Sequence, residues 1–217
     1  MAIAFLPPDI EQGPCAVTVG VVAGKIDIEP VAESFKGLVD VCLISDSCST
    51  VGCEAVFRQS ENPQEVEVLL PLRDDPSQVS RLLVSVAVSP FPALDSVAYA
   101  VLAPAFAPGG AGVDWDDVCL ILRSGKRAVL AMVDTANAMT DLYSSVMSEL
   151  MRLQAFQTTG VMPACFLPLG AGLDWTREVQ YLGIFAEMVA PYALRLPSIP
   201  FILGGPPVYS MLMVFSE

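Results

Sequence analysis

The chain has 217 residues, a formal net charge of −13 and no histidine, and 53% of its residues are hydrophobic. The acidic balance repels phosphate backbones and argues against nucleic-acid binding, while the lack of histidine removes the commonest general base. Residues 82–113 are strongly apolar but include Pro90, Pro92, Pro104 and Pro108. We therefore interpret this stretch as core elements joined by turns, because a membrane-spanning helix would not tolerate so many prolines.

The first half of the chain begins with apolar runs that are typical of buried strands. AVTVGVV covers Ala16–Val22 and VDVCLIS covers Val39–Ser45. Between them, apolar residues at helical spacing predict a helix over Glu29–Leu38. Strand, helix and strand within about 30 residues predict a βαβ unit with adjacent parallel strands.

The middle of the chain is less regular. EVEVLL predicts a strand over Glu65–Leu70, and the capping residues Asp75–Ser77 predict a helix over Gln78–Ala87. A second helix is predicted over Leu94–Leu102. The Pro/Gly-rich segment Pro104–Gly112 predicts a hinge, which divides the chain into a partial α/β region (1–108) and an α+β domain (109–217).

The second half carries clearer signals for helices and strands. It predicts a helix over Asp116–Leu122, a strand over Lys126–Val133, a helix over Ala138–Phe156, a strand over Val161–Pro168, a helix over Trp175–Val189, and strands over Ile199–Leu203 and Val208–Phe215. The apolar residues expected to face the core from the two long helices are Leu142, Val146, Leu150 and Leu153, and then Val179, Leu182, Phe185 and Met188. We expect the α/β fold class, with a mixed four-stranded sheet covered by two helices in this half.

Two similar stretches hold the only tryptophans, GAGVDW ending at Trp115 and GAGLDW ending at Trp175. Glycines permit a tight turn and an aspartate can cap the helix that follows. We therefore interpret GAGLDW as a strand-to-helix corner that Asp174 caps. GAGVDWDD has two interpretations, a similar corner or a functional loop in which Asp114 and Asp117 project together from the start of a helix.

The order of these motifs resembles that of the tubulin/FtsZ superfamily. VDVCLIS is similar to a strand of the VDTLIVI type, and LGAGLDW is similar to a TAGFDL-like turn. GVDWDD resembles the catalytic loop N-x-D-x-x-D, with Gly112 in place of the asparagine. The likeness covers about residues 15–46 and 109–217. It implies that Asp114 and Asp117 reach into the next subunit and position the water that attacks GTP.

The family's glycine-rich GTP-binding loop, G-G-G-T-G-T-G, has no counterpart here, and neither a P-loop nor G-x-G-x-x-G occurs. We therefore expect a shortened or degenerate relative that binds no cofactor. The favoured function is that of a non-enzymatic structural or assembly protein, whose partner is a tubulin/FtsZ-like GTPase or itself. One alternative is activation of a partner GTPase in trans by Asp114 and Asp117.

A second alternative is an unrelated α/β domain that binds a small molecule or is an enzyme. Its candidate site residues follow the second predicted strand, since ligands favour the carboxyl ends of parallel strands; they are Asp46, Ser47, Cys48 and Cys53. No motif supports a particular reaction at these residues.

The six cysteines include no C-x-x-C pair. Cys42, Cys48 and Cys53 lie close in sequence, where a metal site or a disulfide could form, but Cys42, Cys119 and Cys165 sit in apolar runs that favour small core residues. The start, MAIAFLPPDIEQ, lacks the basic region and cleavage pattern of a signal peptide. We expect reduced thiols, no bound metal and a cytoplasmic protein.

Overall fold

The computed structural model describes residues 17–22, 25–30, 41–44, 55–72, 78–106, 113–134, 138–152, 157–168, 174–202 and 207–216. The elements of these residues are β1 (Val17–Val22), β2 (Lys25–Pro30), β3 (Val41–Ile44), β4 (Ala55–Gln59), β5 (Glu65–Pro71), β6 (Val79–Val88), α1 (Ala93–Phe106), α2 (Trp115–Leu122), β7 (Arg127–Val133), α3 (Ala138–Arg152), β8 (Thr158–Pro168), α4 (Trp175–Val189), β9 (Leu194–Arg195), β10 (Phe201–Ile202) and β11 (Val208–Phe215).

The described strands join into one 11-stranded sheet with the order β1-β2-β3-β4-β5-β6-β7-β11-β8-β10, and β9 also pairs with β8. Most neighbours are antiparallel, but β3 and β4, β6 and β7, and β8 with both β9 and β10 are parallel. The sheet is therefore mixed, and the α/β class expected from the sequence is confirmed.

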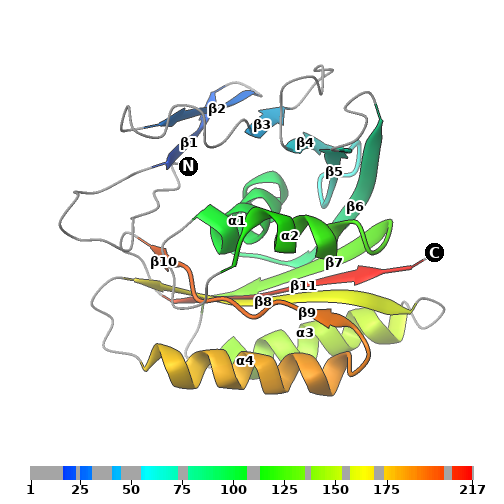
Figure 1. Ribbon diagram of the computed structural model, residues 1–217, viewed down its shortest axis with the longest axis vertical. Helices are drawn as coiled ribbons and strands as arrows, with labels where there is room; N and C mark the ends of the chain where they lie inside the picture. Colours follow the sequence, from blue (N-terminus) through cyan, green and yellow to red (C-terminus); the bar gives the residue numbers. More distant parts are fainter. Residues whose placement is uncertain are drawn as a thin grey trace.

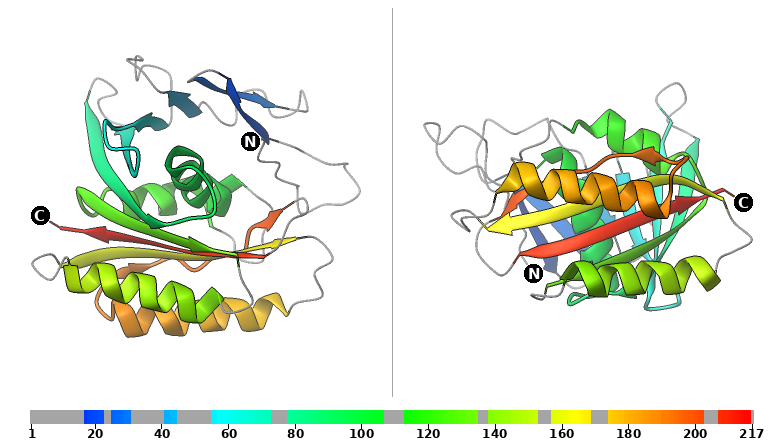
Figure 2. Two further views of the ribbon diagram at one scale, coloured as in Figure 1. Left: turned by 180° about the vertical axis from the view of Figure 1, so that it is seen from behind. Right: turned by 90° about the horizontal axis from the view of Figure 1, so that it is seen from below.

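The sheet bends around two of the helices. Figure 1 shows α3 and α4 against one face of β7, β11 and β8, while α1 and α2 lie on the opposite face, beneath β4 and β5. The view from behind in Figure 2 shows the same layers. Contacts of α1 with β4, β5 and β6, and of α2 with β8, agree with this arrangement.

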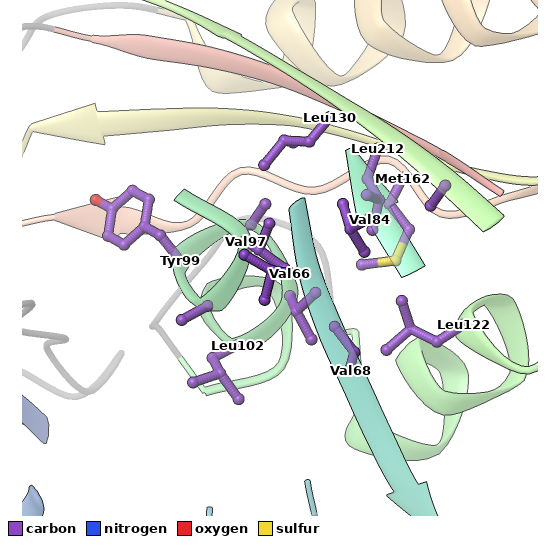
Figure 3. Packing of buried hydrophobic residues seen from close by; sticks show 14 of the residues in the cluster. Val66, Val68, Val84, Val97, Tyr99, Leu102, Leu122, Leu130, Met162 and Leu212 are labelled. Atoms are coloured by element: carbon purple, nitrogen blue, oxygen red, sulfur yellow. The ribbon is translucent and has the colours of Figure 1, made fainter. Parts of the chain in front are cut away.

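The largest core surrounds α1, whose residues Val97–Ala103 are all at most 6% exposed. A helix that is apolar on every side belongs in the interior of a protein. Figure 3 shows Val97, Tyr99 and Leu102 of α1 in one cluster with Val66 of β5 and Leu130 of β7. The Tyr99 ring stacks on Phe166 with centroids 4.4 Å apart. In the described part of the apolar stretch 82–113, β6 and α1 are core elements as predicted. Among the described residues, no helix is long and apolar enough to cross a membrane.

One helix predicted from the sequence is a strand in the structure. The helix expected over Gln78–Ala87 is β6, in which Leu82, Val84 and Val86 are buried while the residues between them are less so. That alternation is the period of a strand, and β6 pairs with β5 and β7 on its two edges.

The βαβ unit predicted near the N-terminus is also corrected, because a strand lies between β1 and β3. Residues 25–30 form β2, which lies between β1 and β3 and is antiparallel to both. The helix expected from Glu29 is therefore wrong at residues 29–30, and its residues 31–38 lie outside the described ones. The sequence of Lys25–Pro30 alternates charged and apolar residues, which is the period of a strand.

The second half follows the predictions closely. Helices α2, α3 and α4 and strands β7, β8 and β11 occupy the expected segments, whereas β9 was not predicted. Leu142 and Val146 of α3 are buried as expected, and the side chain of Leu150 and all of Leu153 fall outside the described part. Pro104–Phe106 continue α1, which corrects the start of the predicted hinge, and residues 107–112 are not described.

Candidate functional site

In the described ends of the two tryptophan-containing stretches, Asp114 and Asp174 begin helices in the same way. Asp114 is the N-cap of α2 in an extended backbone conformation, and its Oδ1 accepts a hydrogen bond from the Asp117 N–H at 2.8 Å. Asp174 is the N-cap of α4, and its Oδ1 accepts from the N–H groups of Thr176 and Arg177 at 3.1 and 3.3 Å. Each carboxylate satisfies N–H groups that a helix start leaves without intrahelical partners. The cap predicted at Asp174 is confirmed.

The start of α2 gathers three exposed carboxylates, those of Asp114, Asp116 and Asp117. The helix dipole favours negative charge at this end. Trp115 anchors the start of α2, because its partly buried side chain packs against the core around α1. The structure thus brings Asp114 and Asp117 together through a capping hydrogen bond and leaves both side chains at the surface.

The outward face of α4 exposes a row of large apolar side chains. Tyr181, Ile184 and Met188 are 43%, 57% and 68% exposed, and their spacing puts them on one side of the helix. We call these three residues the α4 stripe. Tyr192, just beyond the helix, is 94% exposed. Met188 was expected to face the core, so this prediction is wrong.

Charged residues border the α4 stripe at both ends. The Arg177 Nε donates to the Tyr181 hydroxyl at 2.7 Å, and its guanidinium carbon lies 5.2 Å from the centre of the Tyr181 ring. At the other end, Arg195 forms an ion pair with Glu187 at 3.4 Å. An apolar centre with a charged rim is the usual composition of a protein interface.

The inner side of α4 determines which face is presented outward. Leu182 and Phe185 are buried against the sheet, and the Tyr209 hydroxyl of β11 donates to the Glu178 carboxylate at 2.9 Å. Beside Tyr209, burial raises the pKa of the Cys165 thiol to about 12. A thiol with such a pKa stays protonated at neutral pH and is a poor nucleophile. The buried Leu182 and Phe185, together with the Tyr209–Glu178 hydrogen bond, fix the rotation of α4 about its axis. The α4 stripe is therefore left exposed.

Most of the remaining candidate residues from the sequence are not among the residues that the structure describes. Asp46, Ser47, Cys48 and Cys53 are not among the described residues, and of Cys42 only the strand backbone is described. Cys119 and Cys165 are buried, as expected for core cysteines. Within the described ranges, no three His, Cys, Asp or Glu side chains are grouped so that they could hold a metal ion.

Comparison of the sequence with protein-family models gives no match, and no curated protein sequence matches significantly. Among solved structures, the fold is similar to an empty FtsZ dimer from M. jannaschii, with 16% identity and a TM-score of 0.46 over 57% of this chain and 36% of that one. A tryptophan-to-tyrosine mutant of M. jannaschii FtsZ aligns with 16% identity and a TM-score of 0.42, over 57% and 37% of the two chains. The chain thus spans little more than a third of the FtsZ chains that it matches.

Proposed function

We propose that this chain is a non-enzymatic structural or assembly protein, which binds itself or a tubulin/FtsZ-like GTPase through the outward face of α4. The α4 stripe is the observation that carries the proposal. Its three large apolar side chains are 43–68% exposed on consecutive turns of one helix. Contiguous exposed apolar surface rimmed by polar residues marks interaction sites, and an amphipathic helix face is a common element of protein recognition.

The class of partner is inferred from the sequence. The order of VDVCLIS, GVDWDD and LGAGLDW resembles that of the tubulin/FtsZ superfamily, whose members assemble with one another. The sequence has no glycine-rich run of the kind that cradles phosphates. We therefore infer a degenerate relative that joins an assembly without binding GTP.

Co-sedimentation with a purified tubulin/FtsZ-like GTPase tests this proposal. Ile184→Glu puts a charge at the centre of the stripe, and Leu120→Glu makes the same change at an equally exposed residue of α2; the two side chains are 57% and 58% exposed. The wild type and Leu120→Glu are expected to sediment with the partner, and Ile184→Glu to remain in the supernatant. Equal sedimentation of both variants would contradict a role for α4, and tight GTP binding by this chain would contradict the degenerate-relative proposal.

A second candidate function is activation of the partner GTPase in trans. Asp114 and Asp117 are exposed at the start of α2, where a carboxylate could orient a water for phosphoryl transfer. The test is the rate of GTP turnover by the partner with and without this chain. Asp114→Asn retains a capping side chain, so a loss of activation in this variant and in Asp117→Asn would reflect the lost charge. Unchanged turnover on adding the wild type would exclude this function.

A further inference from the structure

We propose that the α4 stripe binds a second copy of this chain, with the two α4 helices packed antiparallel around a two-fold axis beside Ile184. This inference rests on the proposed function, because it names the partner of the same face. Closed two-fold dimers are the commonest symmetric assemblies, and each patch must then be complementary to itself.

The apolar residues of the stripe have the spacing that such self-complementarity needs. An axis at the level of Ile184 and Phe185 puts Ile184 beside its own copy. Tyr181 and Met188 lie almost equally far from that axis in opposite directions along the helix, so Tyr181 of each copy faces Met188 of the other. Since both are exposed in the single chain, 43% and 68%, this pairing buries apolar surface from every member of the stripe.

The charges around the stripe fit the same arrangement. The hydrogen bond and ring contact with Tyr181 hold the Arg177 guanidinium at the level of Tyr181. In the antiparallel pair this level faces Met188, next to Glu187 of the second copy. Each dimer therefore contains two oppositely charged Arg177–Glu187 pairs, and Arg195, which already contacts Glu187 at 3.4 Å, lies in the same network. A parallel arrangement would place like charges together.

The available area suits a reversible dimer. Tyr181, Ile184, Met188 and Tyr192 expose 43%, 57%, 68% and 94% of their surface, which at roughly 200 Å² for a large side chain is about 500 Å² of apolar surface per copy. Arg177, Gln180 and Glu187 add polar surface at the rim. The total approaches the roughly 800 Å² per partner of a standard interface. The net charge of −13 on each copy opposes association, so we expect a dissociation constant in the micromolar range.

Sedimentation velocity of the purified full chain, from about 1 to about 200 μM, tests the inference. The wild type and Leu120→Glu are expected to shift from monomer to dimer as concentration rises, and Ile184→Glu to stay monomeric with an unchanged melting temperature. Arg177→Glu and Glu187→Arg alone are each expected to weaken the dimer by about tenfold, because every dimer contains two such pairs. The double variant, which exchanges the two charges, is expected to restore it.

A wild type that remains monomeric at the highest concentration would overturn the inference, as would a dimer that survives Ile184→Glu. Failure of the double variant to restore the dimer would overturn the antiparallel register. A monomeric chain that still sediments with a tubulin/FtsZ-like GTPase would overturn this inference while leaving the proposed function standing.

Discussion

Replacing Asp114 by alanine should destabilise the protein through the loss of a helix cap. The Asp114 carboxylate accepts the Asp117 N–H at 2.8 Å, and removing such a cap costs about 1 kcal/mol. Its charge also interacts favourably with the helix dipole, for roughly 0.3–1 kcal/mol, although the nearby carboxylates of Asp116 and Asp117 offset part of this gain. We therefore expect Asp114→Ala to lower the free energy of unfolding by about 1 kcal/mol, which for a chain of this size lowers the melting temperature by roughly 2–4 °C.

Urea unfolding measures this change through the midpoint at constant slope. Asp114→Asn keeps an acceptor at the cap, so it should stay within a few tenths of a kcal/mol of the wild type. Asp116→Ala is the matched control, because Asp116 is exposed in the same turn and is not the cap; it should change stability by less than about 0.5 kcal/mol. If Asp114→Ala is neutral, or costs no more than Asp116→Ala, the capping role is refuted.

Three further predictions address packing, burial and charge. Gly125→Ala should lower the free energy of unfolding by at least about 1–3 kcal/mol, because an added Cβ would lie 2.0 Å from the Phe215 carbonyl oxygen. Gly183→Ala should stabilise α4 by about 0.5–1 kcal/mol, because nothing lies within 4 Å of an added Cβ. Equal urea midpoints for the two variants would contradict this prediction. The Cys165 thiol, whose pKa burial raises from 9.0 to about 12, should resist alkylation by iodoacetamide at pH 8 until urea unfolds the chain, as mass spectrometry of the Cys165 peptide would show. Because its folded-state pKa is raised, the stability that the neutral thiol contributes is present below about pH 9 and is lost as pH rises towards about 12; rapid native-state labelling would refute its burial. Raising NaCl from about 0.01 to about 0.15 M should tighten the proposed dimer, because the Debye length falls from about 30 to about 8 Å and screens the repulsion between two chains of charge −13; sedimentation that shows dissociation instead would indicate that the Arg177–Glu187 pairs dominate.

The helix α4 shows how far local sequence signals reach. Asp174 as the cap and the apolar residues after it predicted both ends of the helix, and Leu182 and Phe185 are buried as expected. Met188 was placed in the same inward row, but residues spaced by three drift by about 60° per step around a helix of roughly 3.6 residues per turn. By Met188 the row has turned to the solvent side.

The strand β6 shows where local signals mislead. Its residues Val79–Val88 combine an apparent cap before the segment with enough apolar residues to fit either period. The alternation of Leu82, Val84 and Val86 becomes decisive only when β5 and β7 supply hydrogen bonds on both edges. Such pairing partners are distant in sequence. The β propensity of a residue depends on these surroundings more strongly than its helix propensity does.

Only part of the candidate site could be predicted from the sequence. The two aspartate caps could be predicted because each aspartate directly precedes its helix in the chain. The α4 stripe could not, since tyrosine, isoleucine and methionine are equally suited to a core, and the packing of Leu182 and the Tyr209–Glu178 hydrogen bond select which face turns outward. The division into regions 1–108 and 109–217 stays a prediction, with β6 paired to β7 across it.

Hydrogen–deuterium exchange of the full chain, dilute and concentrated and then with a tubulin/FtsZ-like GTPase, tests the central claim most directly. Assembly through the α4 stripe should slow amide exchange in peptides that cover Trp175–Val189. Peptides from α2 and α3 should exchange at their original rates. Slower exchange only in α2 would move the contact to the start of α2 at Asp114. Unchanged exchange everywhere, at every concentration and with the partner present, would contradict an assembly role for this face.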